Sequence, residues 1–258
     1  MSVAKKLSGD LLKAYETGQP IEPVRTIIKG VDEAYAVQRE TVRVWLERGR
    51  TVAGLKIGLT AKAIQAQLGV DEPDFGTLFS DMILSDGAQV SRHQVMQPRI
   101  EAEIAFVMKS DLRGEHISPE QVLAATDYVV PSIEICGSRI ARWDIRIEDT
   151  VADNASAALV VLGTTRQKPT LEGLAAVPMT LQHNDAVVAE GRGDACLGNP
   201  AIAVAWLAQT MTRYGHGLRA GDVVMSGALA KMIAAEPGSR FRADFGDLGS
   251  VSVSFAPT

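Results

Sequence analysis

Apolar and polar residues follow two different periods along the chain, and the change of period divides it into two regions. Leucines recur at helical spacing between residues 7 and 12, and a second apolar face runs through residues 32–48, with Asp32 as the expected helix cap. From about residue 77, short apolar runs bounded by Gly, Pro and polar residues are typical of strands. We therefore expect an N-terminal helical part over 1–76 and a β-rich catalytic domain over 77–258, together forming one functional unit.

The individual elements follow from the same pattern. Strands are expected at 51–58, 77–79, 88–90, 100–108, 128–135, 158–162 and 223–226, with a final hairpin over 241–255. Further helices are expected at 61–68 and 199–215, and another is expected to start at 118–121, with Thr60, Asn199 and Ser118 as the caps. Because the helices flank the strands instead of alternating with them regularly, the pattern predicts an α+β fold with a mixed sheet.

Composition narrows the functional classes. The chain has 258 residues, of which 46% are hydrophobic and 22% charged, which is ordinary for a globular protein with a real core. A net charge of −5 argues against a nucleic-acid partner, and two cysteines do not make a disulfide scaffold. The sequence contains no apolar run long enough for a membrane span and no apolar signal segment near its start. We therefore expect a cytoplasmic protein with no membrane or nucleic-acid partner.

The densest chemical signal is a pair of acids inside an apolar strand. Glu101 and Glu103 are two residues apart, so in a strand they share one face, where two carboxylates repel unless a cation or a proton neutralises them. Glu134 lies inside a second apolar run and is costly to bury alone. Three acids on neighbouring strands could hold Mg²⁺ or Mn²⁺, which prefer oxygen ligands. The alternative is that these strands have a solvated face and bind no metal.

Other residues carry weaker signals. Lys56 interrupts an apolar strand, and a desolvated lysine can have a lowered pKa and shuttle protons; the alternative is a lysine that faces solvent. Residues 149–156 read as a polar loop that could bind a carboxylate, although such loops are mostly turns. Ser226, before Gly227 and after a strand, could belong to an anion-binding nest. None of the four histidines has a zinc-ligand spacing.

Five motifs, spread along nearly the whole chain, occur here in the same order as in one known family. They are Lys56-Ile-Gly-Leu-Thr60, Gln67-Leu-Gly-Val-Asp-Glu-Pro-Asp-Phe-Gly-Thr-Leu78, Pro98-Arg-Ile-Glu-Ala-Glu-Ile104, Ile133-Glu-Ile-Cys-Gly-Ser-Arg139 and Asp149-Thr-Val-Ala-Asp-Asn-Ala-Ser156. The sequence thus resembles the 2-keto-4-pentenoate hydratase family of the fumarylacetoacetate hydrolase superfamily, beside 4-oxalocrotonate decarboxylase.

This resemblance implies a fold, a metal site and further site residues. The fold is a mixed β-roll or barrel with an N-terminal helical part. The metal, Mg²⁺ or Mn²⁺, is held by Glu101, Glu103 and Glu134. The resemblance also implies that Lys56 and Asp74 are catalytic. The predicted substrate-binding residues are Ser156, Arg139, Leu59 and Ser226.

The reaction implied is hydration of 2-hydroxypenta-2,4-dienoate, a small 2-oxo acid in its enol form, to 4-hydroxy-2-oxopentanoate during aromatic meta-cleavage. Lys56 or a metal-bound water would protonate the far carbon, and Asp74 would position or deprotonate the attacking water. Arg99 favours the hydratase branch, because the decarboxylase branch more often has Lys there. The alternatives are decarboxylation of 2-oxohex-3-enedioate and a non-catalytic partner of such an enzyme. Family members form homo-oligomers, and a complex with a pathway decarboxylase is a further expectation.

Overall fold

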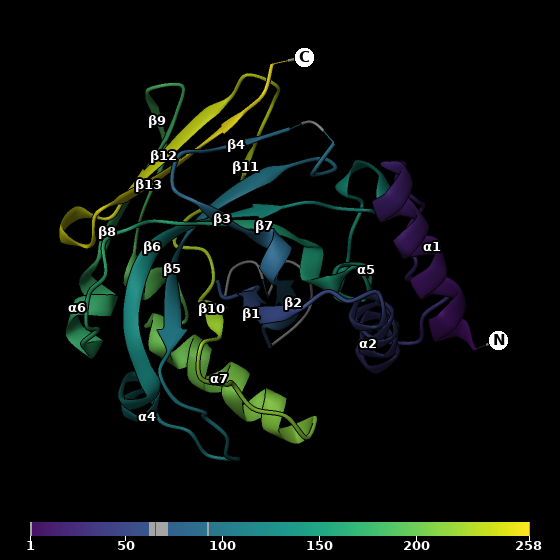
Figure 1. Ribbon diagram of the computed structural model, residues 1–258, viewed down its shortest axis with the longest axis horizontal. Helices are drawn as coiled ribbons and strands as arrows, with labels where there is room; N and C mark the ends of the chain where they lie inside the picture. Colours follow the sequence, from purple (N-terminus) through teal and green to yellow (C-terminus); the bar gives the residue numbers. More distant parts are fainter. Residues whose placement is uncertain (1, 62–64, 66–71, 92, 258) are drawn as a thin grey trace.

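The computed structural model describes residues 2–61, 65, 72–91 and 93–257. Two β-sheets form its centre, and helices cover them (Figure 1). The helices are α1 (Val3–Thr17), α2 (Val31–Glu47), α4 (Pro119–Ala125), α5 (Ile147–Ala152), α6 (Leu171–Ala176) and α7 (Pro200–Arg213). The helix expected at 61–68 lies almost entirely outside the described residues.

The larger sheet has eight strands and mixed strand directions. Its order is β2 (Asp74–Phe79), β1 (Val52–Gly58), β10 (Val223–Met225), β5 (Arg99–Met108), β6 (Thr126–Cys136), β7 (Ala157–Leu162) and β3 (Ile83–Ser85), with β11 (Ile233–Ala234) paired to the start of β5. The smaller sheet has the order β4 (Ala88–Val90), β13 (Ser250–Phe255), β12 (Arg240–Asp244), β8 (Pro178–His183) and β9 (Ala186–Arg192). Strands β12 and β13 pack on β6 of the larger sheet.

This architecture confirms the predicted α+β class with mixed sheets and N-terminal helices. Both sheets are open along their described strands, so the closed-barrel form of the prediction is not observed. The larger sheet includes both β1 and β2, and residue 76 lies within β2. The division of the chain at residue 76 stays a prediction.

Local sequence signals explain where several helices begin. Helix α4 starts with the predicted capping box, in which Ser118 and Gln121 satisfy each other's backbone N–H groups. Asn199 caps α7 as expected, with Pro200 at the first helical position. The prediction of Asp32 as the cap of α2 is wrong: the cap position is Gly30, and Asp32 lies in the first turn, where its charge favours the positive helix end.

The N-terminal helices attach to the larger sheet through aromatic side chains. The Trp45 ring of α2 meets Tyr15 of α1 edge-on at 4.9 Å and Phe79 of β2 at 5.3 Å between ring centroids. Edge-to-face pairs at this distance add to the burial of the rings themselves. Figure 1 shows α1 and α2 together beside the β1–β2 end of this sheet. Among the described residues, no helix combines the length and apolar character needed to cross a membrane.

Candidate active site

Strand register brings the three predicted acids together on the larger sheet. Glu101 and Glu103 lie two residues apart on β5, and Glu134 of β6 is the direct cross-strand partner of Glu101. Glu103 and Glu134 are fully buried, whereas Glu101 is partly exposed. Three carboxyl groups thus gather on one face, where each adds to the desolvation cost of the others.

The buried carboxylate oxygens are only partly satisfied. Glu103 Oε2 accepts a hydrogen bond from the Gly227 backbone N–H at 2.8 Å, but Glu103 Oε1 has no partner among the described residues. Among the same residues neither oxygen of Glu134 has a hydrogen-bond donor, although its Oε1 lies 3.2 Å from the Lys56 ammonium nitrogen. Buried polar atoms without partners are expensive, so this arrangement fits a cation that would be bound by these oxygens.

The pKa values of the three acids also fit a cation site. Burial, and next the charge of Glu134, raise the pKa of Glu101 to about 7. Burial and the neighbouring acids raise the pKa of Glu103 well above its ordinary value. Burial also raises the pKa of Glu134, although Lys56 opposes the rise. Without added positive charge the cluster therefore binds protons, and a divalent cation would compete with those protons.

Lys56 of β1 points into the same cluster. Its side chain is buried, its Nζ donates a hydrogen bond to the Ala155 carbonyl at 3.0 Å, and it forms the ion pair with Glu134. Burial by itself lowers the pKa of Lys56, but the charge of Glu134 and the other acids outweighs burial and leaves this pKa well above its ordinary value. The prediction of a lowered pKa is therefore wrong, because the counter-charges come from a distant strand. A raised pKa means that the Lys56 ammonium holds its proton more firmly, so its role as the acid of the reaction stays a prediction.

Asp74 lies beside Lys56 because the two strands have glycine at the point of contact. Gly58 of β1 is the cross-strand neighbour of Asp74 on β2. A Cβ atom at residue 58 would stand 2.2 Å from Asp74 Oδ1 and 3.4 Å from Lys56 Nζ. Only glycine leaves room there for both side chains. Burial raises the pKa of Asp74, although Lys56 opposes the rise.

A strained turn positions the carbonyl that Lys56 contacts. Residues 154–156 form a 3-10 turn with positive φ values of 54°, 51° and 55°, and none of the three is glycine. The Asn154 side chain accepts a hydrogen bond from the Thr77 N–H at 2.8 Å and donates one to the Thr77 carbonyl at 2.9 Å. Left-handed backbone at consecutive non-glycine residues persists only when surrounding contacts impose it, and it is found preferentially at functional sites. No local signal in the sequence indicated this turn.

The description of residues 149–156 as a loop holds only for its second half. Residues 149–152 belong to helix α5, residues 154–156 form the turn, and Asp149 is fully buried. The Asp149 carboxylate accepts hydrogen bonds from the backbone of Val24, Arg25 and Arg146, which ties the chain before α2 to the start of α5. The predicted substrate contact Ser156 is also buried, with its hydroxyl 3.2 Å from that of Thr150.

Two further predicted substrate residues lie at strand ends next to the cluster. Ser226 directly follows β10, and its buried hydroxyl has no hydrogen-bond partner in the part of the chain that the structure describes. The next residue, Gly227, has φ of 110° and donates its N–H to Glu103, so the bend after β10 brings Ser226 close to Glu103 in the fold. Leu59 follows β1 with a positive φ of 59° and is partly buried against the core.

Arg139 has a different setting. Its buried guanidinium donates through Nε to Asp153 Oδ1 at 2.6 Å and lies 4.1 Å from the centre of the Tyr15 ring. Its backbone N–H donates to the second Asp153 oxygen at 2.9 Å. These contacts favour a packing role beneath α1, and the predicted substrate-binding role of Arg139 stays a prediction.

Sequence reasoning missed Cys136. Ligand atoms of Glu101, Glu134 and Cys136 all lie within 4.8 Å of one another, and Glu103 is not part of that group. The Cys136 thiol lies 3.5 Å from Glu101 Oε2. The signal was available, since Cys136 stands two residues after Glu134 in a strand and so shares its face.

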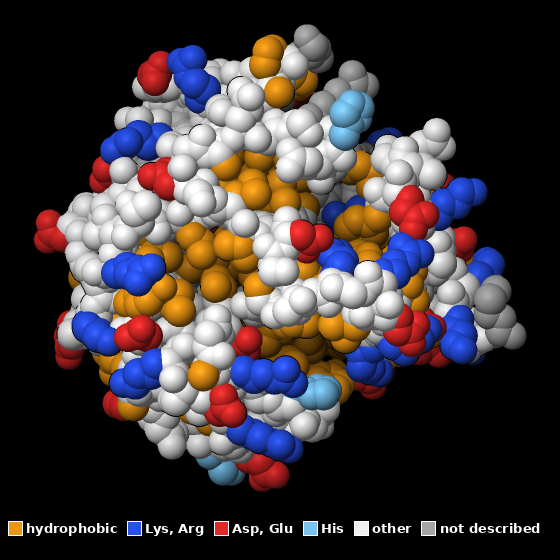
Figure 2. Space-filling model, viewed as in Figure 1, with side chains coloured by type: hydrophobic (Ala, Val, Ile, Leu, Met, Phe, Trp, Pro, Cys, Tyr) orange, Lys and Arg blue, Asp and Glu red, His pale blue; other side chains and the backbone are white. Residues whose placement is uncertain are grey.

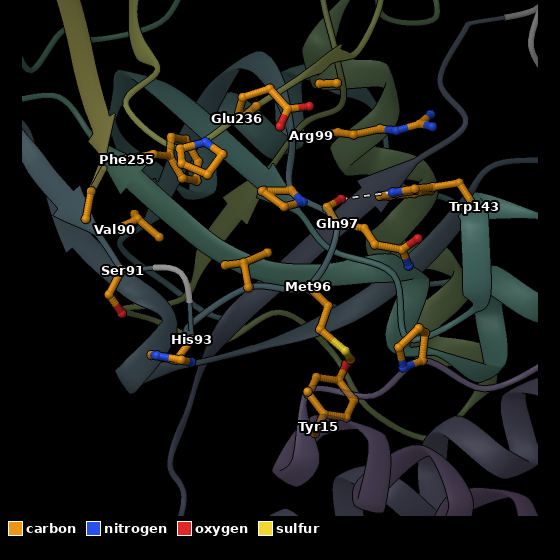
Figure 3. A pocket seen from close by; sticks show the side chains of 18 of the residues that line it. Tyr15, Val90, Ser91, His93, Met96, Gln97, Arg99, Trp143, Glu236 and Phe255 are labelled. Atoms are coloured by element: carbon orange, nitrogen blue, oxygen red, sulfur yellow. Dashed lines mark hydrogen bonds between the residues drawn. The ribbon is translucent and has the colours of Figure 1, made fainter. Parts of the chain in front are cut away.

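A groove with a volume of about 690 Å³ is bounded by Tyr15, His93, Arg99, Trp143 and Glu236 among others (Figure 3). In Figure 3 the Arg99 and Trp143 side chains lie next to each other, with 4.4 Å from the guanidinium carbon to the ring centre. None of the predicted metal ligands lines this groove, so we do not identify it with the reaction site.

Comparisons of the chain with a family model and with known proteins agree on one family. The model of the family described as fumarylacetoacetate (FAA) hydrolase C-terminal matches residues 49–256. The chain is 47% identical over 257 residues to 2-keto-4-pentenoate hydratase 2 of Dechloromonas aromatica (strain RCB), covering 98% of each chain. It is also 47% identical over 247 residues to 2-keto-4-pentenoate hydratase of Paraburkholderia xenovorans (strain LB400), covering 95% of this chain and 92% of that one.

Among solved structures, 4-oxalocrotonate decarboxylase from Pseudomonas putida G7, complexed with magnesium and adipate, superimposes with a TM-score of 0.92. The two are 33% identical, and the match covers 98% of this chain and 97% of that one. The chain is thus a member of the fumarylacetoacetate hydrolase superfamily. Within it, the chain belongs to the 2-keto-4-pentenoate hydratase family, which confirms the predicted family.

Proposed function

We propose that this protein is a hydro-lyase that adds water to 2-hydroxypenta-2,4-dienoate and releases 4-hydroxy-2-oxopentanoate. The observation that carries the proposal is the convergence of Lys56 with Glu101, Glu103 and Glu134 on one buried face. The near-full-length identity to hydratases supports the same reaction.

The three acids would hold a divalent cation, Mg²⁺ or Mn²⁺. The unpartnered oxygens of Glu103 and Glu134 supply hard ligands, and Glu101 adds a partly exposed carboxylate at the open side. When bound, the cation would polarise the 2-oxo group as a Lewis acid. The magnesium in the related decarboxylase supports this assignment.

The chain's own residues would move the protons. The Lys56 ammonium, which pairs with Glu134, would donate a proton to the terminal carbon of the dienol. Asp74, beside Lys56, would orient the water that adds at carbon 4. The hydroxyl of Ser226, which has no partner among the described residues, and the residues Ser156 and Leu59 would contact the substrate.

The direct test is a spectrophotometric assay. Freshly generated 2-hydroxypenta-2,4-dienoate is mixed with the chelator-treated protein, with and without Mg²⁺ or Mn²⁺, and the loss of dienol absorbance is followed. The proposal expects turnover that depends on the added metal and yields 4-hydroxy-2-oxopentanoate. Equal turnover in chelator, or none with either metal, would contradict it.

Replacing Lys56 tests the proton donor. Lys56→Ala is expected to lower turnover by roughly 10²–10⁴-fold, the range typical of a lost general acid, while changing metal affinity much less. Turnover and Mn²⁺ binding are measured on the same preparation. Lys168→Ala, which removes an exposed lysine paired with Asp127, is the control and should behave as the wild type. A Lys56 variant that simply fails to bind metal would assign Lys56 to structure.

A second reaction is decarboxylation of 2-oxohex-3-enedioate on the same site. The close superposition on 4-oxalocrotonate decarboxylase favours keeping it as a candidate. Release of CO₂ from that diacid, measured beside the hydration assay, separates the two reactions.

We also propose a cytoplasmic homo-oligomer that can associate with a pathway decarboxylase. Figure 2 shows hydrophobic side chains gathered in the middle of one face, with charged ones toward its edge. Extended apolar areas on a protein surface are typical of protein–protein contact. Sedimentation of the purified chain measures the oligomeric state.

A further inference from the structure

We propose that Cys136 adds a sulfur ligand to the acidic cluster, so that Glu101, Glu134 and Cys136 together form a binding site for a soft divalent ion such as Cd²⁺. The inference shares two acids with the proposed Mg²⁺ or Mn²⁺ site and in that respect rests on the proposed function. It concerns which metals this chain accepts, not the reaction.

The strand geometry places the thiol correctly. Glu134 and Cys136 are alternate residues of β6 on one face, and Glu101 is the cross-strand partner of Glu134. Their ligand atoms lie within 4.8 Å of one another. Ligand atoms around one tetrahedral zinc ion are roughly 3.5 Å apart and somewhat farther apart around the larger cadmium ion, so rotation of the side chains would draw the three groups together by about 1 Å or less. One ion can therefore contact all three groups with little movement of the backbone.

The bonding around these groups points to a missing ligand. Within the described part of the chain, neither oxygen of the fully buried Glu134 has a hydrogen-bond partner, and Oε2 also lacks the ion pair that Oε1 forms with Lys56. The Cys136 thiol donates a hydrogen bond to Glu101 Oε2 at 3.5 Å, so its only printed partner is itself one of the proposed ligands. The other buried thiol, Cys196, donates to the Ser226 carbonyl at 2.9 Å, away from these ligands.

Charge balance also favours the complex. On binding, the thiol loses its proton to solvent and the sulfur forms a bond to the ion. The three ligands alone, two carboxylates and one thiolate, then carry three negative charges. A divalent ion together with the ammonium of Lys56, 3.2 Å from Glu134, neutralises them. Thiolate ligands select soft metals over magnesium and manganese.

Cadmium titration of the chelator-treated full chain tests the inference. The readout is the ultraviolet sulfur-to-cadmium charge-transfer band, which needs no catalysis. We expect one cadmium–thiolate band per chain in the wild type and in Cys196→Ala, and no band in Cys136→Ala or Cys136→Ser. Cadmium affinity should fall in both Cys136 variants by at least the roughly 10–100-fold that loss of an outer partner costs. Mn²⁺ affinity, measured by electron paramagnetic resonance, should change much less.

The outcomes separate the two proposals. A wild-type protein that binds Mn²⁺ but gives no band, or a band that survives in Cys136→Ala, overturns the sulfur ligand and leaves the oxygen site standing. A wild-type protein that binds neither ion overturns both. Circular dichroism of each variant identifies misfolding, and Cys136→Ser, which keeps the size of the side chain, decides the matter if Cys136→Ala fails to fold.

Discussion

The Glu134→Gln variant is expected to lose metal-dependent turnover by roughly 1,000-fold or more, because Lewis-acid stabilisation is worth several kcal/mol. The amide keeps the size of the side chain but removes the charge that both Lys56 and a cation would use. Neither oxygen of Glu134 has another hydrogen-bond partner, so no other described contact would keep the group in place. Turnover is measured with saturating Mg²⁺ or Mn²⁺, and bound metal is measured by elemental analysis.

A matched substitution controls for the loss of a carboxylate as such. Glu190→Gln changes an exposed glutamate on β9 and should leave turnover and metal content unchanged. If Glu134→Gln does not fold, Glu101→Gln is used instead. Glu101 is partly exposed, so its replacement does not leave a buried charge without its partner. Wild-type turnover and metal content in a folded Glu134 variant would remove this residue from the metal site.

The Asp153→Asn variant is expected to lower the free energy of unfolding by about 3–5 kcal/mol, because it leaves the Arg139 charge buried without its partner. Asp153 receives hydrogen bonds from both the side chain and the backbone of Arg139, and both side chains are buried. Urea unfolding followed by circular dichroism measures the change.

Two comparisons make this result interpretable. Asp185→Asn breaks the exposed ion pair with Arg240 and should cost less than about 1 kcal/mol. The double variant Arg139→Met with Asp153→Leu removes both charges and should be more stable than Asp153→Asn alone. If that folded double variant also keeps its affinity for substrate, Arg139 has only a packing role; a selective rise in KM would return it to the substrate site.

Local patterns in the sequence predicted many elements well. The alternation in β5 placed Glu101 and Glu103 on one face, and the caps of α4 and α7 fixed their starts. The hairpin of β8 and β9 was missed, although Asn184 and Asp185 carry the positive φ values that a tight two-residue turn requires. That signal was local and could have been used.

Other features depend on contacts between distant segments. The cross-strand pairing of Glu101 with Glu134 follows from the register of two strands, which no short motif encodes. The direction of the Lys56 pKa depends on acids that β6 and β5 bring to β1. The resemblance to a family supplied Asp74 and Ser156, which the residue pattern alone did not.

The left-handed turn at residues 154–156 has a consequence for engineering this protein. Left-handed backbone costs roughly 1–2 kcal/mol per non-glycine residue, so substitution by glycine in this turn would be an obvious choice for raising thermal stability. Such a change at Ala155 would relax the backbone that aims a carbonyl at Lys56. Laboratory selection for thermotolerance should therefore leave this triplet untouched and seek its gains on the exposed helices instead.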